Sequence, residues 1–429
     1  MNTKRIIQVD EKVPPHLLIP LSFQHTFAMF GASVLVPLLF NINPSIVLFM
    51  NGIGTLLFIL ISNGKAPAYL GSSFAFLGPG AIIIANMGGF NFAQGAFITT
   101  GLFGCILAFV IYKFGTKWID ICLPPAAMGS VVSLIGFELA AMTVSGETGL
   151  ANEIGAHIMH NGKIVASKED IIVFIVTLSV AVLGSIIFKG FLSTIPILTA
   201  IIVGYIVAYI FGQVDLTPVM NVGIFTLPTF SMPKFSLQAT LTMLPALLVI
   251  LSEHISHQVV TSNIIGRDLL KDPGLHKTIF ADNFSTMLSG FVGGVPTTTY
   301  GENIGVMAIT KVYSVRVIAG AAVISICMAF IGPFSALIQT IPGNVIGGVT
   351  FLLYGMIGTS GIRLLVDKKV DYSKTKNLVL TSVIFVTGLS QVSISIGGVE
   401  LKGMVLSSMV GIIISLLFHL FDKFSITNE

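Results

Sequence analysis

The chain has little charge and few cysteines. Only 10% of its 429 residues are charged, whereas 54% are hydrophobic, and the mean hydropathy is +0.94. A soluble globular domain carries about 25% charged residues, so this composition excludes an ordinary soluble protein and indicates a protein of the lipid bilayer. The three cysteines (Cys105, Cys122 and Cys327) form no CxxC pair, which excludes a disulfide framework and a cysteine metal site.

Targeting, enzyme and metal motifs are missing as well. The first fifteen residues, MNTKRIIQVDEKVPP, have no apolar core and no cleavage site, so we expect no signal peptide. No GxSxG, Walker or dinucleotide-binding motif is present, and the order EHISH at Glu253 is not the HExxH of a zinc enzyme. We therefore predict no enzyme, no metal, no cofactor and no nucleic-acid partner.

What the sequence has instead is a series of apolar runs of about 17–25 residues, the length of a transmembrane helix. We predict fourteen such helices, at residues 17–40, 44–62, 67–86, 94–112, 119–143, 170–188, 193–212, 237–262, 278–293, 296–310, 317–340, 343–361, 377–395 and 403–421. With a cytoplasmic N-terminus, 18 of the 22 basic residues fall on the cytoplasmic side and 4 outside, the bias that the positive-inside rule expects. Both termini are then cytoplasmic.

Two long polar stretches, 144–169 and 213–236, fall on the outside in this topology and are expected to be solvated loops. His157 and His160 lie in the first of them, where we expect exposed loop residues rather than ligands.

Two pairs of landmarks indicate an internal duplication. Gln24-His25 and Glu253-His254 are offset by 229 residues, and Gly71-Ser72 and Gly301-Glu302 by 230. A repeat of seven helices is odd in number, so the second copy would lie upside down, as in many secondary transporters. Chance matching in so biased a sequence is the alternative, but the third helix of each half is interrupted, which favours the repeat.

The third and tenth predicted helices begin with extended stretches. Residues 67–73 and 296–300 are rich in Pro, Gly and β-branched residues, and half-helices are expected to begin at Phe74 and Gly301. Irregular backbone in lipid is tolerated only where it is buried in protein or lines a cavity. The two half-helices run in opposite directions, so their N-termini should meet near the midplane and offer N–H donors to a carbonyl-bearing substrate. Two ordinary kinks are the alternative, but a kink would not need a glutamate.

Four acids lie within predicted spans: Glu138, Glu253, Asp282 and Glu302. Burying an acid in a membrane costs at least about 2.5–3.5 kcal/mol, so each is a functional candidate. Glu253 and His257 share one helical face and are a candidate proton-handling pair. Asp282 and Glu138 lie near the ends of their helices, where we expect a structural hydrogen bond.

At these residues the chain resembles a known family. GENIGVMAIT, followed by Lys311, matches the signature (Q/E)-N-x-G-x-x-x-x-T-(R/K/G) of the nucleobase–ascorbate transporter family, and SFQH supplies the family's Gln-His pair. PAYLGSSFAF, SEHISH and DPGLH are similar to the bacterial members that carry uracil with a proton. The resemblance extends over essentially the whole chain.

The resemblance implies an all-α polytopic membrane protein with 14 transmembrane helices in two inverted 7-helix repeats, and short antiparallel β-strands interrupting helices 3 and 10. It implies a core domain made of residues 1–115 and 236–341 and a gate domain made of 116–235 and 342–429. Homodimers would form through the gate domain. The glycines that follow Pro124-Pro125 and Pro342-Gly343 (Gly129, Gly347 and Gly348) are expected to allow close, sliding contact.

The resemblance also implies import of uracil with a proton across the cell inner membrane by alternating access. Carried over by position, the substrate-binding residues would be Ser73, Phe74, Glu253, Tyr300, Gly301, Glu302 and Tyr354. Proton coupling would involve Glu253, His257 and Glu302, with His25 expected near this group. Supporting contacts would come from Gln24, His25, Asn303 and Thr310. Purine carriers usually have Gln where this chain has Glu302, which favours uracil. A carrier of xanthine or uric acid, or an anion carrier of the same fold, stays open.

Overall fold

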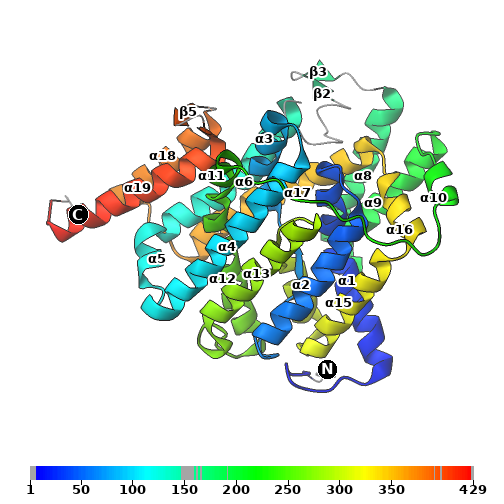
Figure 1. Cartoon of the computed structure of the whole chain (residues 1–429), viewed down its shortest axis with the longest axis horizontal. Helices are drawn as coiled ribbons and strands as arrows, with labels where there is room; N and C mark the ends of the chain where they lie inside the picture. The colour runs from blue at the N-terminus through cyan, green and yellow to red at the C-terminus, as the bar shows by residue number, and fades with distance from the viewer. Residues whose placement is uncertain are drawn as a thin grey trace.

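The computed structural model describes residues 6–145, 159–160, 163–164, 167–190, 192–390, 392–396 and 399–426, which are mostly helical (Figure 1). The first part of the chain forms α1 (Pro15–Leu39), α2 (Pro44–Ile61), α3 (Leu77–Met87), α4 (Phe90–Phe114), α5 (Lys117–Cys122), α6 (Pro125–Ser145), α8 (Lys168–Ile187), α9 (Pro196–Ile210) and α10 (Thr217–Asn221). The second part forms α11 (Leu237–Met243), α12 (Ala246–Ile265), α13 (Leu275–Val292), α14 (Gly301–Thr310), α15 (Val315–Ala329), α16 (Gly332–Gln339), α17 (Gly343–Asp367), α18 (Thr375–Leu389) and α19 (Gly403–Lys423).

Short turns and strands complete the described elements. The turns are η1 (Phe74–Phe76), η2 (Leu192–Thr194) and η3 (Leu270–Gly274). The strands pair as β1 (Leu70–Ser72) with β4 (Thr297–Thr299), β2 (Met159–His160) with β3 (Lys163–Ile164), and β5 (Ser393–Ile396) with β6 (Val399–Lys402).

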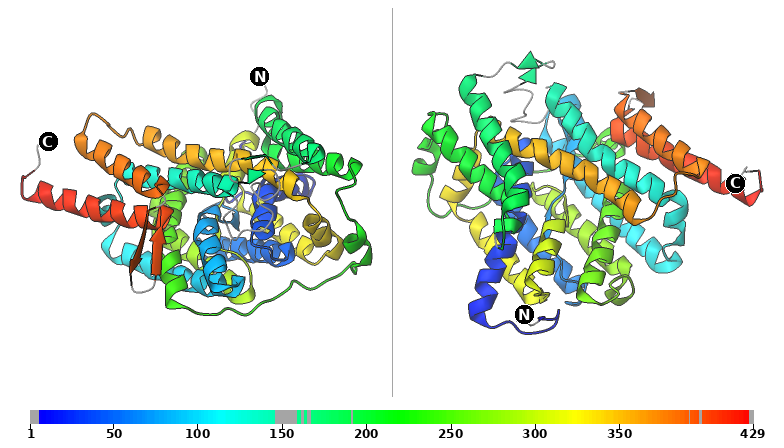
Figure 2. Two further views of the ribbon diagram at one scale, coloured as in Figure 1. Left: turned by 90° about the horizontal axis from the view of Figure 1, so that it is seen from above. Right: turned by 180° about the vertical axis from the view of Figure 1, so that it is seen from behind.

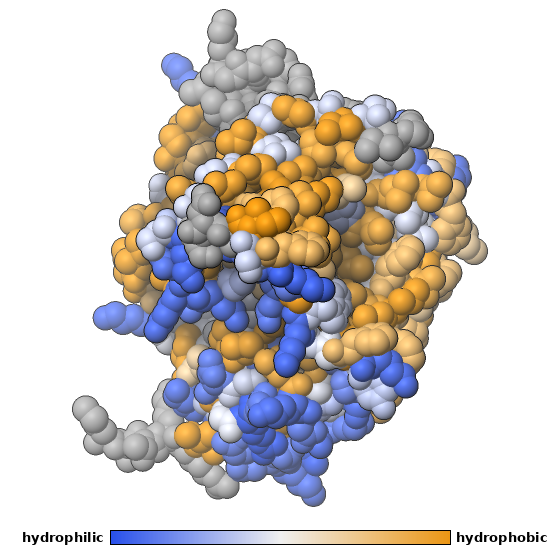
Figure 3. Space-filling model, turned by 90° about the vertical axis from the view of Figure 1, so that its left-hand side faces the viewer, coloured by the Kyte–Doolittle hydropathy of each residue, from blue (hydrophilic) through white to orange (hydrophobic). Residues whose placement is uncertain are grey.

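The apolar runs of the sequence are membrane-length helices. Within the described residues, seven helical stretches are long and apolar enough to cross a bilayer: α1, α2, α4, α8, α11 with α12, α17 and α19. Hydrophobic residues cover much of the face shown in Figure 3. Large exposed hydrophobic side chains include Phe109 on α4 and Ile186 on α8, which are 60% and 78% exposed. The predicted multi-pass membrane protein is thereby confirmed, while the count of fourteen crossings and the inverted repeat stay predictions.

Several predicted boundaries were wrong. The span 119–143 is divided into α5 and α6 at Leu123, because Pro124 and Pro125 have no N–H to continue the helix. The span 377–395 ends at Leu389, and its last residues belong to the hairpin of β5 and β6. The loop 213–236 contains α10, and the loop 144–169 contains the β2–β3 hairpin; His157 lies outside the described residues.

The helices pack in two sets. One contains α1, α2, α4, α13 and α15, and the other contains α6, α8, α9, α17, α18 and α19. Seen from behind, α17 and α6 cross in front of the first set (Figure 2). The expected close contact is confirmed at Gly129 and Gly348, where the partners are helices of the same set, and sliding stays a prediction. An added Cβ on Gly129 would lie 2.5 Å from Leu365 of α17, and one on Gly348 would lie 2.8 Å from the Phe174 carbonyl of α8. These glycines hold helices of one set together.

The predicted antiparallel strands are confirmed as β1 and β4, with Leu70 opposite Thr299 and Ser72 opposite Thr297. Their outer edges are covered by hydroxyl groups from neighbouring helices. Thr55 of α2 accepts from the Leu70 N–H at 2.9 Å, and Thr286 of α13 accepts from the Thr297 N–H at 3.1 Å. Because every backbone group in a membrane interior needs a partner, these threonines make a two-stranded sheet tolerable there.

Candidate functional site

The sheet of β1 and β4 ends where two helical segments begin. Ser73 and Tyr300 have extended backbones (ψ 125° and 129°), and η1 and α14 start at the next residues, Phe74 and Gly301. No side chain caps either start, so first-turn N–H groups are left for other acceptors. The structure therefore has the extended stretch followed by a half-helix that the sequence predicted in both places.

Tyr300 links β1 to β4 by hydrogen bonds and by packing. Its hydroxyl donates to the Ser72 carbonyl at 2.7 Å, and its N–H donates to the Tyr69 carbonyl at 3.1 Å. The ring lies directly on Gly71, since a Cβ added there would be 2.5 Å from two ring carbons. Tyr300 is 6% exposed. Hydrogen bonds and packing therefore fix the position of Tyr300. Because Gly301 follows it directly, Tyr300 also fixes the position at which α14 begins.

Helix α12 brings Glu253 and His257 to this place. It packs against β4, α14 and η1. His257 Nδ1 lies 3.0 Å from the Thr299 hydroxyl, and a Cβ on Gly301 would be 3.4 Å from His257 Nε2. Glu253 lies one turn earlier on the same helical face, and α12 contacts α14, whose first turn contains Glu302. The candidate site therefore combines two residues of α12 with the first two residues of α14, namely Glu253, His257, Gly301 and Glu302.

Glu302 is exposed and faces a cavity of about 280 Å³. The cavity lies between α14, α1, the segment before α9, and α17. Leu353 and Met356 of α17 line it, and the sequence analysis did not single out either residue. Their spacing of three residues on one helix was the only available signal, and it does not distinguish a cavity wall from ordinary packing.

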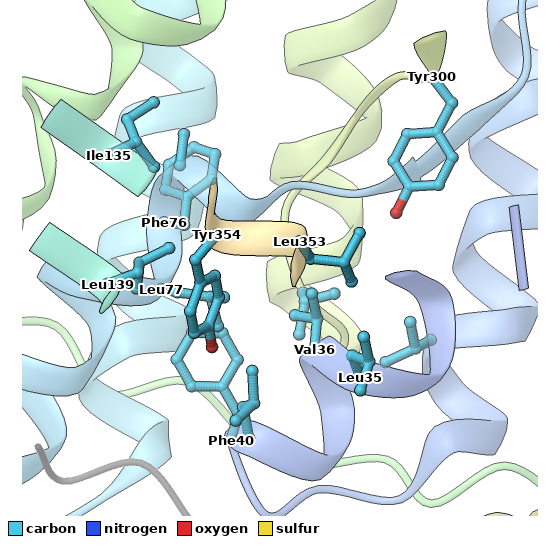
Figure 4. Packing of buried hydrophobic residues seen from close by; sticks show 14 of the residues in the cluster. Leu35, Val36, Phe40, Phe76, Leu77, Ile135, Leu139, Tyr300, Leu353 and Tyr354 are labelled. Atoms are coloured by element: carbon cyan, nitrogen blue, oxygen red, sulfur yellow. The ribbon is translucent and has the colours of Figure 1, made fainter. Parts of the chain in front are cut away.

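Tyr354, the neighbour of Leu353, lies elsewhere. It is fully buried, and Figure 4 shows it among Phe40, Leu77 and Leu139, with its hydroxyl directed away from Tyr300. It is not among the residues that line the Glu302 cavity. Its role in substrate binding stays a prediction.

The expected supporting residues lie on α1 and α14. Asn303 donates from Nδ2 to the His25 carbonyl at 3.0 Å and lies 3.1 Å from His25 Nδ1. His25 is therefore held by α14. Thr310 donates to the Val306 carbonyl at 2.8 Å, near the end of α14. Gln24 and Thr310 line a separate groove beside the N-terminal segment.

The two remaining membrane acids have hydrogen-bond partners. Glu138 accepts from the Met404 N–H at 2.8 Å, the structural role that was expected. Asp282 lies 3.5 Å from the Thr298 hydroxyl and 3.7 Å from His254 Nδ1. Asp282 and His254 are each 1% exposed, and the sequence analysis missed this pair. In the part of the chain that the structure describes, no group of three His, Cys, Asp or Glu side chains could hold a metal ion.

The chain is similar to known membrane transport proteins over nearly its whole length. A family model described as a permease family matches residues 16–397. The uracil permease of Escherichia coli K12 is 52% identical over 418 residues, which cover 97% of this chain and 95% of that protein. The uracil permease of Paenibacillus larvae is 48% identical over 99% of both chains. That of Bacillus subtilis is 43% identical over 97% of this chain and 96% of the relative.

Solved structures with the same fold are more distant in sequence. The transmembrane domain of the cyanobacterium bicarbonate transporter BicA matches with a TM-score of 0.62 at 14% identity, over 96% of this chain and all of that one. The murine anion transporter Slc26a9 matches with a TM-score of 0.69 at 12% identity, over 96% of this chain and 70% of that one. At such identities the likeness concerns the fold alone.

Proposed function

The chain belongs to the permease family, as a nucleobase–ascorbate transporter, and we propose that it imports uracil together with a proton. The resemblance stated from the signature at Glu302 is thereby confirmed at the level of the family. The names of the relatives, uracil permeases at 43–52% identity over nearly the whole chain, support uracil as the substrate.

The observation that carries the proposal is the mixture of hydrogen-bonding groups at one place. Uncapped N–H groups open η1 and α14. Glu302 lies in the first turn of α14, and Glu253 lies on α12, which contacts both η1 and α14. Uracil is a flat ring with alternating carbonyl and N–H groups. Backbone N–H groups would bind its carbonyl oxygens, and the carboxylates would accept from its N–H groups. Ser73, Phe74, Tyr300 and Gly301 complete the proposed binding site. Tyr354 of α17 does not line the Glu302 cavity in this structure, and its contact with the substrate is part of the proposal.

Proton coupling is proposed to involve Glu253, His257 and Glu302. An ionised carboxylate only accepts hydrogen bonds, whereas a protonated one also donates. The protonation state of Glu253 or Glu302 therefore changes the hydrogen bonds offered to uracil. Because binding linkage is reciprocal, uracil would in turn change the affinity of the site for a proton. The contact of His257 with Thr299 supports a path for that proton beside the substrate.

Alternating access is proposed as a movement of the two helix sets against each other. The cavity at Glu302 has walls from both, namely α1 and α14 on one side and α9 and α17 on the other. A relative movement of the sets would change how this cavity opens. We place the sets in the core and gate domains, in a homodimer of the cell inner membrane with both termini in the cytoplasm.

The test uses purified protein in proteoliposomes with radiolabelled uracil. We expect uptake when the outside is acidified, its loss with a protonophore, and no competition by bicarbonate. Competition with xanthine and uric acid measures selectivity among nucleobases. Bicarbonate or xanthine uptake without uracil uptake would refute the assignment in favour of an anion or purine carrier. The electrostatic repulsion expected between two neighbouring carboxylates and an anion argues against the first of these outcomes.

A further inference from the structure

An apolar groove lies on the outside of the helix bundle, away from Glu302. It has a volume of about 540 Å³ and lies between α4, the segment from α11 to α12, and the unit of β6 and α19. Phe103 and Ile106 of α4 line one wall, Leu241 and Leu248 another, and Met409 of α19 the third. Figure 1 shows α4, α11 and α19 side by side at this place, and α11 contacts both α4 and β6.

The groove is open, and its α4 and α19 walls belong to helices long and apolar enough to cross a bilayer. Phe103, Ile106, Leu241 and Met409 are each between 38% and 51% exposed. Its lining residues are all apolar. In water such a groove would be an aggregation or docking site. On membrane-spanning helices, the medium that fills it is hydrocarbon.

One end of the groove leads to a basic and aromatic edge. Phe103, Ile106, Leu107 and Val110 follow helical spacing along one face of α4, and Lys113 lies one turn further at the border of that face. The Lys113 ammonium lies 5.8 Å from the ring centre of Phe109 and 5.7 Å from that of Tyr112. Trp118 follows directly, with its indole N–H donating to the Gly115 carbonyl. Aromatic and basic residues of this kind mark the membrane–water interface.

The α4 wall of the groove, extended to Lys113, fits one leaflet. Ten residues separate Phe103 from Lys113, which is about 15 Å along an α-helix. The hydrocarbon core of a bilayer is about 30 Å thick, so this stretch of α4 is about half as long as the core is thick. The position of Lys113 at the end of the apolar groove favours a lipid over a second copy of the chain as the occupant. A basic side chain there would attract an anionic lipid headgroup, whereas apolar contact with a second copy does not require one.

We propose that this groove binds a single phospholipid, with an acyl chain between α4 and α19 and its phosphate-bearing headgroup at Lys113. The bound chain fills the space between helices of the two sets described above. This site is independent of the proposed substrate, because none of its residues belongs to the uracil site.

The test is native mass spectrometry of the protein after reconstitution in equal amounts of phosphatidylglycerol and phosphatidylethanolamine. The wild type is expected to retain one phospholipid, mostly phosphatidylglycerol. Ile106→Trp fills the groove and should lower retention at least fivefold. Its control is Ile186→Trp, at an apolar α8 position that is 78% exposed, where retention should not change. Met409→Trp fills the groove from the opposite wall, should Ile106→Trp fail to fold.

Lys113→Gln examines the headgroup. It should keep the retained lipid but remove the preference for phosphatidylglycerol, whereas Lys368→Gln, at an exposed lysine after α17, should not. Equal retention by the wild type and both groove variants would overturn the proposal. So would a loss of dimers in Ile106→Trp with lipid retention unchanged, because a second copy would then occupy the groove. None of these measurements requires uracil, so their failure is distinct from a failure of the transport function.

Discussion

Replacing Gly71 by alanine should distort the candidate site through Tyr300. Gly71 has no positive φ, so the backbone itself accepts an alanine. The packing around Gly71 leaves no room for the methyl group. The new Cβ would lie 2.5 Å from two ring carbons of Tyr300, a separation that real Cβ atoms do not show. The ring has to move, and with it the hydrogen bond from its hydroxyl to the Ser72 carbonyl. Since Tyr300 directly precedes Gly301 and Glu302, the start of α14 moves too.

The expected magnitude follows from the packing. Inserting a methyl group into a filled interior typically costs about 1–3 kcal/mol. If this strain falls on the geometry that binds uracil, the Kd rises about 5- to 150-fold, because each 1.4 kcal/mol is a factor of about ten. Loss of the Tyr300–Ser72 hydrogen bond adds about 0.5–1.5 kcal/mol to the cost in stability.

The assay is uracil binding to purified protein, together with its melting temperature. Gly78→Ala is the matched control, because Gly78 is a buried glycine of α3 and an added Cβ would meet no atom within 4 Å other than its chain neighbours and the nearby backbone of its own helix. It should bind and melt like the wild type. Tyr300→Ala removes the ring that Gly71→Ala would meet, so adding Gly71→Ala to it should lower the melting temperature little further. Wild-type binding and melting by Gly71→Ala, or equal losses in Gly78→Ala, would refute this reasoning.

Substitutions at Glu302, His257, Thr299 and Asn303 test the other parts of the site. Glu302→Gln exchanges a carboxylate oxygen for an amide donor and should weaken uracil binding roughly tenfold or more in a folded protein; an unchanged Kd would contradict the role of Glu302. His257→Ala should keep binding but lower proton-driven uptake and change its pH profile, and Thr299→Val should do the same more weakly because it removes the partner of His257; unchanged uptake at every pH would exclude both. Asn303→Ala should lower the melting temperature by removing the α1–α14 link to His25, a cost of about 1–3 kcal/mol. Asn303→Asp should not restore it, because an ionised carboxylate cannot donate to the His25 carbonyl.

Local features of the site could be predicted from the sequence because they depend on local chemistry. Proline at 67 and 296 and glycine at 301 disfavour a continuous helix, and threonine favours an extended backbone. The two interrupted helices therefore follow from composition alone. Their pairing as strands came from the family resemblance, and the register of Leu70 with Thr299 is a result of the structure.

Contacts between distant segments could not be predicted in this way. The closeness of Tyr300 to Gly71 joins positions 229 residues apart, and no periodicity of either segment encodes it. The glycines of α6 and α17 illustrate the same limit. Glycine indicates that another backbone or side chain comes close, but it does not say which. A Cβ on Gly136 would lie 2.2 Å from the Tyr354 carbonyl oxygen, so the close partner of α6 is α17.

The three threonines of β4 show why the interrupted helix needs this sequence. Thr297 donates to the Ser285 hydroxyl at 2.7 Å, and Thr298 donates to Asp282 at 3.5 Å, both on α13. Thr299 instead meets His257 of α12 at 3.0 Å. One short strand thus ties α12 and α13 to the start of α14. A shift of α12 against α13 would break contacts on both sides of the strand and leave buried polar groups unpaired. We therefore expect these three helices to move together in the proposed transport cycle, and the proposed change in access to arise at the wall that α9 and α17 provide.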